Sequence, residues 1–204
     1  MIDLVTFTSI KERYGLYASW AIWSDVGDKP KSNIGDLSLF DLRKNPTLLE
    51  QLKPHVILVG LNISRGLIKE SFANFHDSRP QGTDFKIRHA LRGSDYWGAY
   101  MTDLFKDLDE KDSNKVKALI KNDPSLIAAH VTLLRDEIRH VVGESSARAT
   151  LIAFGDVVYT HLKNNFSTEC EVKKIPHYAS QNYNNKDLYK KAVWQSLMMG
   201  ASSE

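Results

Sequence analysis

The chain has 204 residues, of which 42% are hydrophobic and 25% are charged, a composition that fits one folded domain and argues against disorder. Its formal net charge of +2 and its one cysteine, Cys170, exclude a strongly basic surface overall, an internal disulfide and a cysteine-based zinc cluster. The sequence has no signal-peptide pattern and no apolar stretch long enough to span a bilayer. We therefore expect a cytoplasmic protein with no membrane, metal or cofactor partner.

The first 53 residues are expected to be an N-terminal extension of a single domain that covers residues 1–204. Within this extension, residues 16–23 are rich in aromatic side chains, which favour a half-buried strand. Residues 25–38 contain two glycines and a proline, which is typical of a loop. The core of the domain is expected over residues 54–200.

The core contains several short apolar segments of the kind that form buried strands. The strands are predicted at residues 55–60, 99–103, 149–154 and 171–175.

Helical patterns separate or follow these strands. The best of them covers residues 124–142, where Asp123 is a good N-cap and Gly143 a good stop. Residues 156–162 and 186–198 are also predicted to be helices. Strands that alternate with helices predict an α/β fold, with three layers (α/β/α) and a mostly parallel central sheet of about four strands.

Three polar segments directly follow predicted strands. They are Gly60-Leu61-Asn62, Thr102-Asp103-Leu104 and His177-Tyr178-Ala179-Ser180. In parallel α/β sheets, ligands bind outside the carboxyl ends of the strands, so these segments are the candidates for a functional site.

Together the segments resemble the motifs of the uracil-DNA glycosylase superfamily. Residues 60–62 are similar to its first motif and residues 177–180 to its second. Between them, residues 74–76 and 84–90 are similar to the aromatic segment and the following helix of the mismatch-specific branch. The resemblance covers about residues 54–194, and it implies a uracil-DNA glycosylase-like fold.

The resemblance also implies roles for individual residues. Asn62 falls on the residue that positions the attacking water, and His177 falls on the histidine that contacts the flipped base; these two are the candidate catalytic residues. Phe75 lies at the spacing of the aromatic residue that stacks on the base. The candidate substrate-binding residues are Gly60, Leu61, Phe75, Asp103 and Ser180.

Asp103 stands where several branches of the family have an asparagine that reads the edge of a pyrimidine. An ionised carboxylate only accepts hydrogen bonds. It would repel the O4 atom of uracil, but it can accept from the exocyclic amine of cytosine or adenine. The residue at this position therefore bears directly on which base is recognised.

The implied partner is DNA, from which the protein would flip and hydrolytically remove a deaminated or damaged base. Phosphate contacts are expected from Arg65, Arg79, Lys86 and Asn182, and the chain is expected to be a monomer or a weak homodimer. The alternative is a non-catalytic nucleic-acid or nucleotide-binding protein that retains the fold. Both stay open, because residues 63, 64, 178 and 179 differ from the family pattern.

Overall fold

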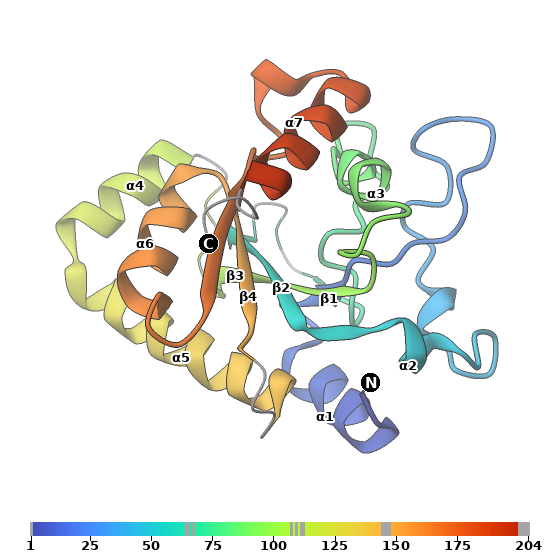
Figure 1. Ribbon diagram of the computed structural model, residues 1–204, viewed down its shortest axis with the longest axis horizontal. Helices are drawn as coiled ribbons and strands as arrows, with labels where there is room; N and C mark the ends of the chain where they lie inside the picture. Colours follow the sequence, from blue (N-terminus) through green and yellow to red (C-terminus); the bar gives the residue numbers. More distant parts are fainter. Residues whose placement is uncertain are drawn as a thin grey trace.

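The computed structural model describes residues 2–63, 66, 68–106, 108, 110, 113–143 and 148–199. The protein is an α/β protein with a five-stranded, mostly parallel sheet in the order β1-β3-β2-β4-β5 (Figure 1). Strands β2 to β5 are parallel to their neighbours, whereas β1 pairs antiparallel with β3. The strands are β1 (Ser19–Trp20), β2 (Lys53–Asn62), β3 (Ala99–Phe105), β4 (Thr150–Phe154) and β5 (Glu171–Ile175).

The four strands predicted in the core are confirmed, and they form the parallel part of the sheet. The expected number of about four strands is one too low, because the aromatic N-terminal segment adds β1 as an outer strand beside β3. Ser19 pairs with Met101 and Trp20 with Tyr100. The Trp20 ring packs edge-on against Tyr100, with the ring centroids 5.0 Å apart, and this buried contact attaches the N-terminal segment to the core.

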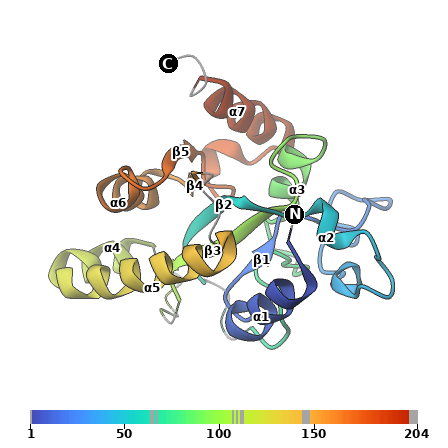
Figure 2. The same cartoon turned by 60° about the horizontal axis from the view of Figure 1, so that its bottom comes forward.

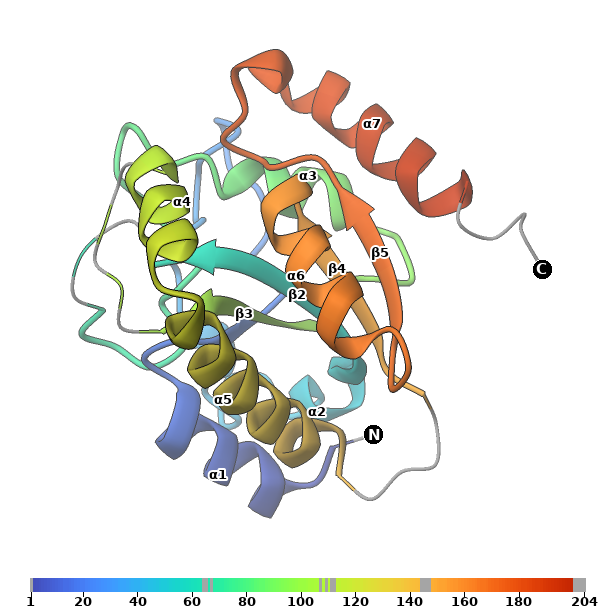
Figure 3. The same cartoon turned by 90° about the vertical axis from the view of Figure 1, so that its left-hand side faces the viewer.

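Helices cover both faces of the sheet. In Figures 2 and 3, α3 (Phe85–Leu91) and α7 (Lys186–Met199) lie on one side of the strands, and α1 (Leu4–Tyr14) and α5 (Pro124–Val142) lie on the other. The remaining α-helices in the described part of the chain are α2 (Leu48–Gln51), α4 (Ser113–Asn122) and α6 (Asp156–Phe166).

Alternate residues along each strand divide the core into two clusters. Leu58 and Ile152 pack with the buried residues of α3 and α7. Their neighbours Ile57 and Leu151 pack with those of α1, α5 and α6. This division follows from the two-residue period of a strand, and it determines which face each residue near the site reaches.

Helix α5 begins and ends as its sequence predicts. Asp123 accepts hydrogen bonds from the backbone N–H groups of Ser125 and Leu126, and Gly143 has the positive φ of 70° that ends the helix. Helices α6 and α7 are also confirmed, and they extend to Phe166 and Met199. No helix in the described ranges is long and apolar enough to cross a membrane.

Candidate functional site

The parallel strands bring the candidate residues to one edge of the sheet, the one formed by the carboxyl ends of β2 to β5. Asn62 is the last residue of β2, and it pairs with Phe105, the last residue of β3. Phe154 ends β4, opposite Ile175 at the end of β5. His177 follows β5 by two residues, so it leaves the sheet at the same edge as Asn62.

Gly60 brings the Asp103 carboxyl close to the Phe75 ring. Gly60 on β2 pairs with Asp103 on β3. A Cβ atom added to Gly60 would collide with Asp103 Oδ1 and would lie 3.5 Å from Phe75 Cζ. Glycine is therefore required here because the carboxyl group occupies the space over its Cα atom. Gly60, Phe75 and Asp103 form the centre of the site.

The Asn74 side chain links Asp103 to Phe75. Its Nδ2 atom donates to Asp103 Oδ2 at 2.8 Å and to the carbonyl oxygen of Tyr17 at 2.7 Å. Its Oδ1 atom accepts from the backbone N–H of Phe75 at 3.1 Å. Because Asn74 is only 5% exposed, these bonds are formed away from bulk water.

Phe75 is held in a conformation that aromatic residues rarely adopt. Its φ is +63°, in the left-handed region that costs a residue with a bulky side chain roughly 1–3 kcal/mol. Two hydrogen bonds hold the backbone of Phe75 in this conformation. Its N–H donates to Asn74, and its carbonyl oxygen accepts from Trp23 Nε1 at 3.2 Å. The structure thus fixes the Phe75 ring over Gly60 at a local energetic cost.

Asp103 is buried, with 3% of its surface exposed. Burial raises the pKa of its carboxyl from 3.8 to about 7, although the Asn74 hydrogen bond and the charge of Lys106 act in the opposite direction. The expectation that Asp103 is an ionised acceptor therefore holds only above about pH 7. Below that pH its carboxyl carries a proton and can also donate.

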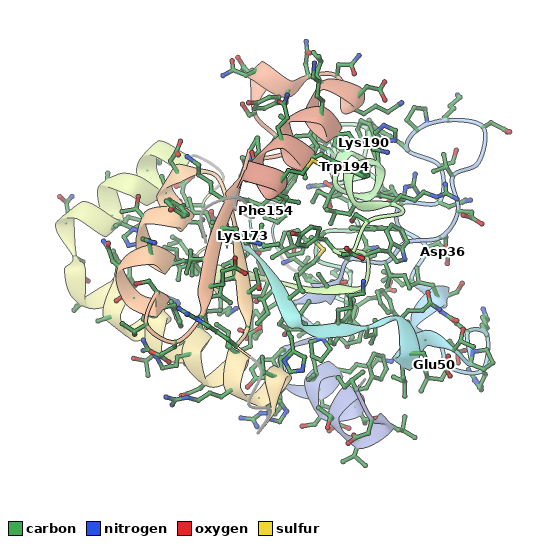
Figure 4. All side chains as sticks on the ribbon, in the orientation of Figure 1. Asp36, Glu50, Phe154, Lys173, Lys190 and Trp194 are labelled. Atoms are coloured by element: carbon green, nitrogen blue, oxygen red, sulfur yellow. The ribbon has the colours of Figure 1, made fainter. Side chains whose placement is uncertain are left out.

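An array of aromatic rings joins Phe75 to His177. Phe154 stacks on Phe75 with centroids 6.3 Å apart, and it contacts the rings of His177 and Tyr178 at 6.3 and 5.2 Å. His177 in turn stacks on Tyr178 at 4.6 Å. Figure 4 labels Phe154 near the middle of the molecule, and it packs in the cluster shared with α3 and α7.

The surroundings of His177 favour its neutral form. Burial and the charge of Lys86 lower the pKa of the imidazole from 6.5 to about 4. Its Nδ1 atom accepts from the backbone N–H of Ala179 at 3.1 Å. The proton of the neutral ring is then on Nε2, which makes Nε2 a hydrogen-bond donor at neutral pH.

Asn62 lies at the same edge but contacts a different part of the chain. Its Nδ2 atom donates to the carbonyl oxygens of Leu108 at 3.0 Å and Glu110 at 2.7 Å. These two bonds fix the plane of the amide. Leu61, the residue before it, packs with the cluster on the α5 side of the sheet, so it faces away from Asp103 and Phe75.

The candidate DNA contacts differ in how exposed and how engaged they are. The Lys86 ammonium is buried and donates to the carbonyl oxygens of Tyr178 and Tyr183 at 2.9 and 2.7 Å. The Arg79 guanidinium forms a paired contact with Asp77, and its side chain is 44% exposed. Asn182 is exposed, whereas Arg65 lies outside the described residues.

Lys86 therefore holds the segment that carries His177 and Ser180. Ser180 donates its backbone N–H to the carbonyl oxygen of His177 at 3.0 Å and accepts from the N–H of Tyr183 at 3.1 Å. These bonds form a turn that leads into the short helix η2 (Gln181–Tyr183). The ordered turn fixes where the His177 ring lies.

The centre of the site is closed in this structure. Phe75, Asp103 and Phe154 are each no more than 3% exposed. Two surface pockets of about 310 and 260 Å³ lie elsewhere: Ala73 and His76 line the first, and Phe85 and Arg88 line the second. A ligand that reached Asp103 would have to displace part of the packing around Phe75.

No protein-family model matches the chain, and no curated protein sequence matches it. Among the residues that the structure describes, no three His, Cys, Asp or Glu side chains come together in a group that could hold a metal ion.

Proposed function

We propose that the protein is a DNA glycosylase that removes a deaminated or damaged base from DNA. One observation carries the proposal: Gly60, Phe75 and Asp103 lie together at the edge of the sheet, and the Phe154 ring connects them to His177. When the packing around Phe75 is displaced, the first three offer a stacking surface and a group that reads a base edge. His177 offers a donor for the charge that develops on the departing base.

The chemistry assigns one task to each side chain. The bond between C1′ of the sugar and the base nitrogen breaks, and its electron pair leaves with the base. A hydrogen bond from His177 Nε2 to an oxygen of the base stabilises that negative charge. The oxygen of a water molecule forms the new bond to C1′, and the proton it loses finally resides on the released base.

Asn62 is the candidate for positioning this water. Two hydrogen bonds fix its amide nitrogen, and this fixes the direction of Oδ1, the atom that would accept from water. A neutral amide is a poor general base. The proposal therefore requires a dissociative reaction, in which the bond to the base is largely broken before water attacks.

The second candidate function is nucleic-acid or nucleotide binding without catalysis. The hydrogen bonds of Asn62 favour this function. Its amide nitrogen donates to the segment after β3, and not to Asp103 or His177. In this case the amide has a structural role. The remaining residues of the site would bind a base but would not hydrolyse it.

A single-turnover glycosylase assay tests the proposal. The substrates are duplex and single-stranded oligonucleotides that carry uracil, hypoxanthine, xanthine or a mismatched base. We expect an abasic product from at least one of them, and His177→Ala should slow its formation by roughly 10²–10³-fold, the effect of losing a charge-stabilising donor. The control is His161→Ala, which changes a half-buried histidine on α6 and should leave the rate unchanged.

Two results would decide between the candidate functions. An abasic product from none of the substrates, together with DNA affinity that falls as salt rises, would leave the binding function. The same rate for His177→Ala and the wild type would overturn the assignment of His177 as the donor.

A further inference from the structure

Asn74 fixes which oxygen of Asp103 can carry a proton. Nδ2 of Asn74 donates to Asp103 Oδ2, and in a neutral carboxyl the carbonyl oxygen is a better acceptor than the hydroxyl oxygen, so this contact favours Oδ2 as the carbonyl oxygen. The proton of the neutral form is therefore on Oδ1. This oxygen lies over the Cα atom of Gly60, beside the edge of the Phe75 ring.

From this geometry we infer that Asp103 reads the base edge in a proton-dependent manner, through Oδ1. With its proton, Oδ1 donates to a carbonyl oxygen, such as that of uracil or hypoxanthine. Without it, Oδ1 accepts from an exocyclic amine, such as that of cytosine or adenine. The inference rests on the proposed function, because that function places a base against Phe75.

The charged groups around Asp103 allow this change of state near neutral pH. Lys106, which follows β3, lowers the pKa of Asp103, whereas Glu137 from α5 and Asp84 from the segment before α3 raise it; burial has the largest effect and brings the value to about 7. On the β5 side the titratable group is His177, which lies beyond the Phe154 ring. Its pKa of about 4 keeps it neutral through this range.

The contact with Asn74 also determines what an amide would do at this position. In Asp103→Asn, the amide oxygen has to face Nδ2 of Asn74, since two NH₂ groups repel each other. The new NH₂ group then takes the place of Oδ1. This variant should behave at every pH like the protonated wild type, and it should favour bases with a carbonyl oxygen.

The test measures the affinity of the free bases uracil and cytosine for the full chain, by calorimetry at about pH 5.5 and about pH 8.5, on either side of the half-protonation point. For the wild type, the affinity for uracil should be lower by about tenfold or more at the higher pH, because only a small fraction of Asp103 is then protonated. Cytosine should change by a similar factor in the opposite direction. In Asp103→Asn both dependences should disappear, and uracil should be preferred throughout.

The same base preference at both pH values in the wild type would overturn the inference, and so would binding of neither base. If Asp103→Asn does not fold, the wild-type comparison alone decides. Failure of the proposed function has a different signature: base binding that changes with pH, with no abasic product from any oligonucleotide, supports the inference and refutes the glycosylase.

Discussion

Asn74 donates a 2.8 Å hydrogen bond to Asp103, which lies 29 residues further along the chain. The same Asn74 side chain also accepts from the backbone of Phe75. One buried amide therefore links the acid on β3 to the aromatic residue with the strained backbone. Any change at Asn74 should affect both the stability of the fold and the geometry of the site.

Asn74→Ala should lower the free energy of unfolding by roughly 2–4 kcal/mol, because it removes three hydrogen bonds and leaves buried polar groups without a partner. Urea denaturation at neutral pH measures this change. The control is Asn182→Ala at an exposed position, which should change the free energy by less than about 0.5 kcal/mol. Equal stability of the Asn74 variant and the wild type would show that these bonds contribute nothing.

The contribution of Asp103 to the stability of the wild type should fall as the pH rises from about 4 to about 7. The pKa of Asp103 is raised from its ordinary value of 3.8 to about 7 in the folded protein, so between these values the folded state binds more protons than the unfolded state. Unfolding then releases a proton, and a higher pH favours it. Above about pH 7 this contribution is constant.

Asp103→Asn should remove this pH dependence, which amounts to about 2–4 kcal/mol between the two pH limits. Denaturation of both proteins at a series of pH values gives the comparison. The difference between their curves isolates Asp103 from the other titrating groups. Parallel curves from pH 4 to 8 would contradict the raised pKa.

Much of the fold follows from local sequence patterns. Residues 149–154 are apolar apart from Thr150, and β4 lies there because both of its faces are buried. Residues 124–142 repeat apolar side chains at helical spacing between a capping residue and a glycine, and α5 has those bounds. In each case the sequence pattern that predicts the element lies within the residues that form it.

The centre of the site was only partly predictable. The sequence identifies Gly60, Phe75 and Asp103 as candidates because each lies in a motif-like segment, but no periodicity links Asn74 to Asp103. Their contact depends on a loop in which Phe72 and Phe75 both have positive φ. A phenylalanine in the sequence does not predict this conformation. The sequence predicts Phe154 only as part of a strand, although an aromatic residue at the carboxyl end of a parallel strand is placed to reach a site.

The role of Lys86 was not visible in the sequence for a related reason. A lysine near a predicted pocket rim is expected to face solvent, where it can contact phosphate. Here its ammonium is buried against two carbonyl oxygens of the segment that carries His177. Such a contact joins residues 92 and 97 positions apart, which only the folded structure reveals.

A buried ion pair lies on the other face of β3, between the sheet and α5. Lys106 Nζ is 2.5 Å from Glu137 Oε2, and the two side chains are 7% and 1% exposed. Glu137 Oε1 also accepts from Tyr100 and Thr102, each at 2.8 Å. Lys106→Met should lower the free energy of unfolding by about 3–5 kcal/mol, because it leaves a buried carboxylate without its cation.

The double variant Lys106→Met/Glu137→Gln should recover a large part of this loss, because the neutral amide still accepts from the two hydroxyl groups. Urea denaturation of the single and double variants measures the recovery. Lys115→Met is the control, since Lys115 is 68% exposed and its ion pair with Glu110 has a 3.6 Å separation; it should change stability by less than about 1 kcal/mol. A double variant less stable than Lys106→Met would contradict the role of the uncompensated charge.

His177 should remain neutral until the solution is strongly acidic. Its pKa is lowered from 6.5 to about 4 by burial first and by the charge of Lys86 second. Between those pH values the unfolded imidazole binds more protons than the folded one, so the contribution of His177 to stability should fall as the pH falls from 6.5 towards 4. The partly exposed ring limits the loss to roughly 1–3 kcal/mol.

Titration of the imidazole signals by NMR measures this pKa directly, and His177→Gln should remove its share of the acid destabilisation. Lys86→Met should raise the pKa of His177 only in part, because burial, the larger cause, remains. A pKa of His177 near 6.5 in the wild type would refute the prediction that the imidazole stays neutral down to about pH 4.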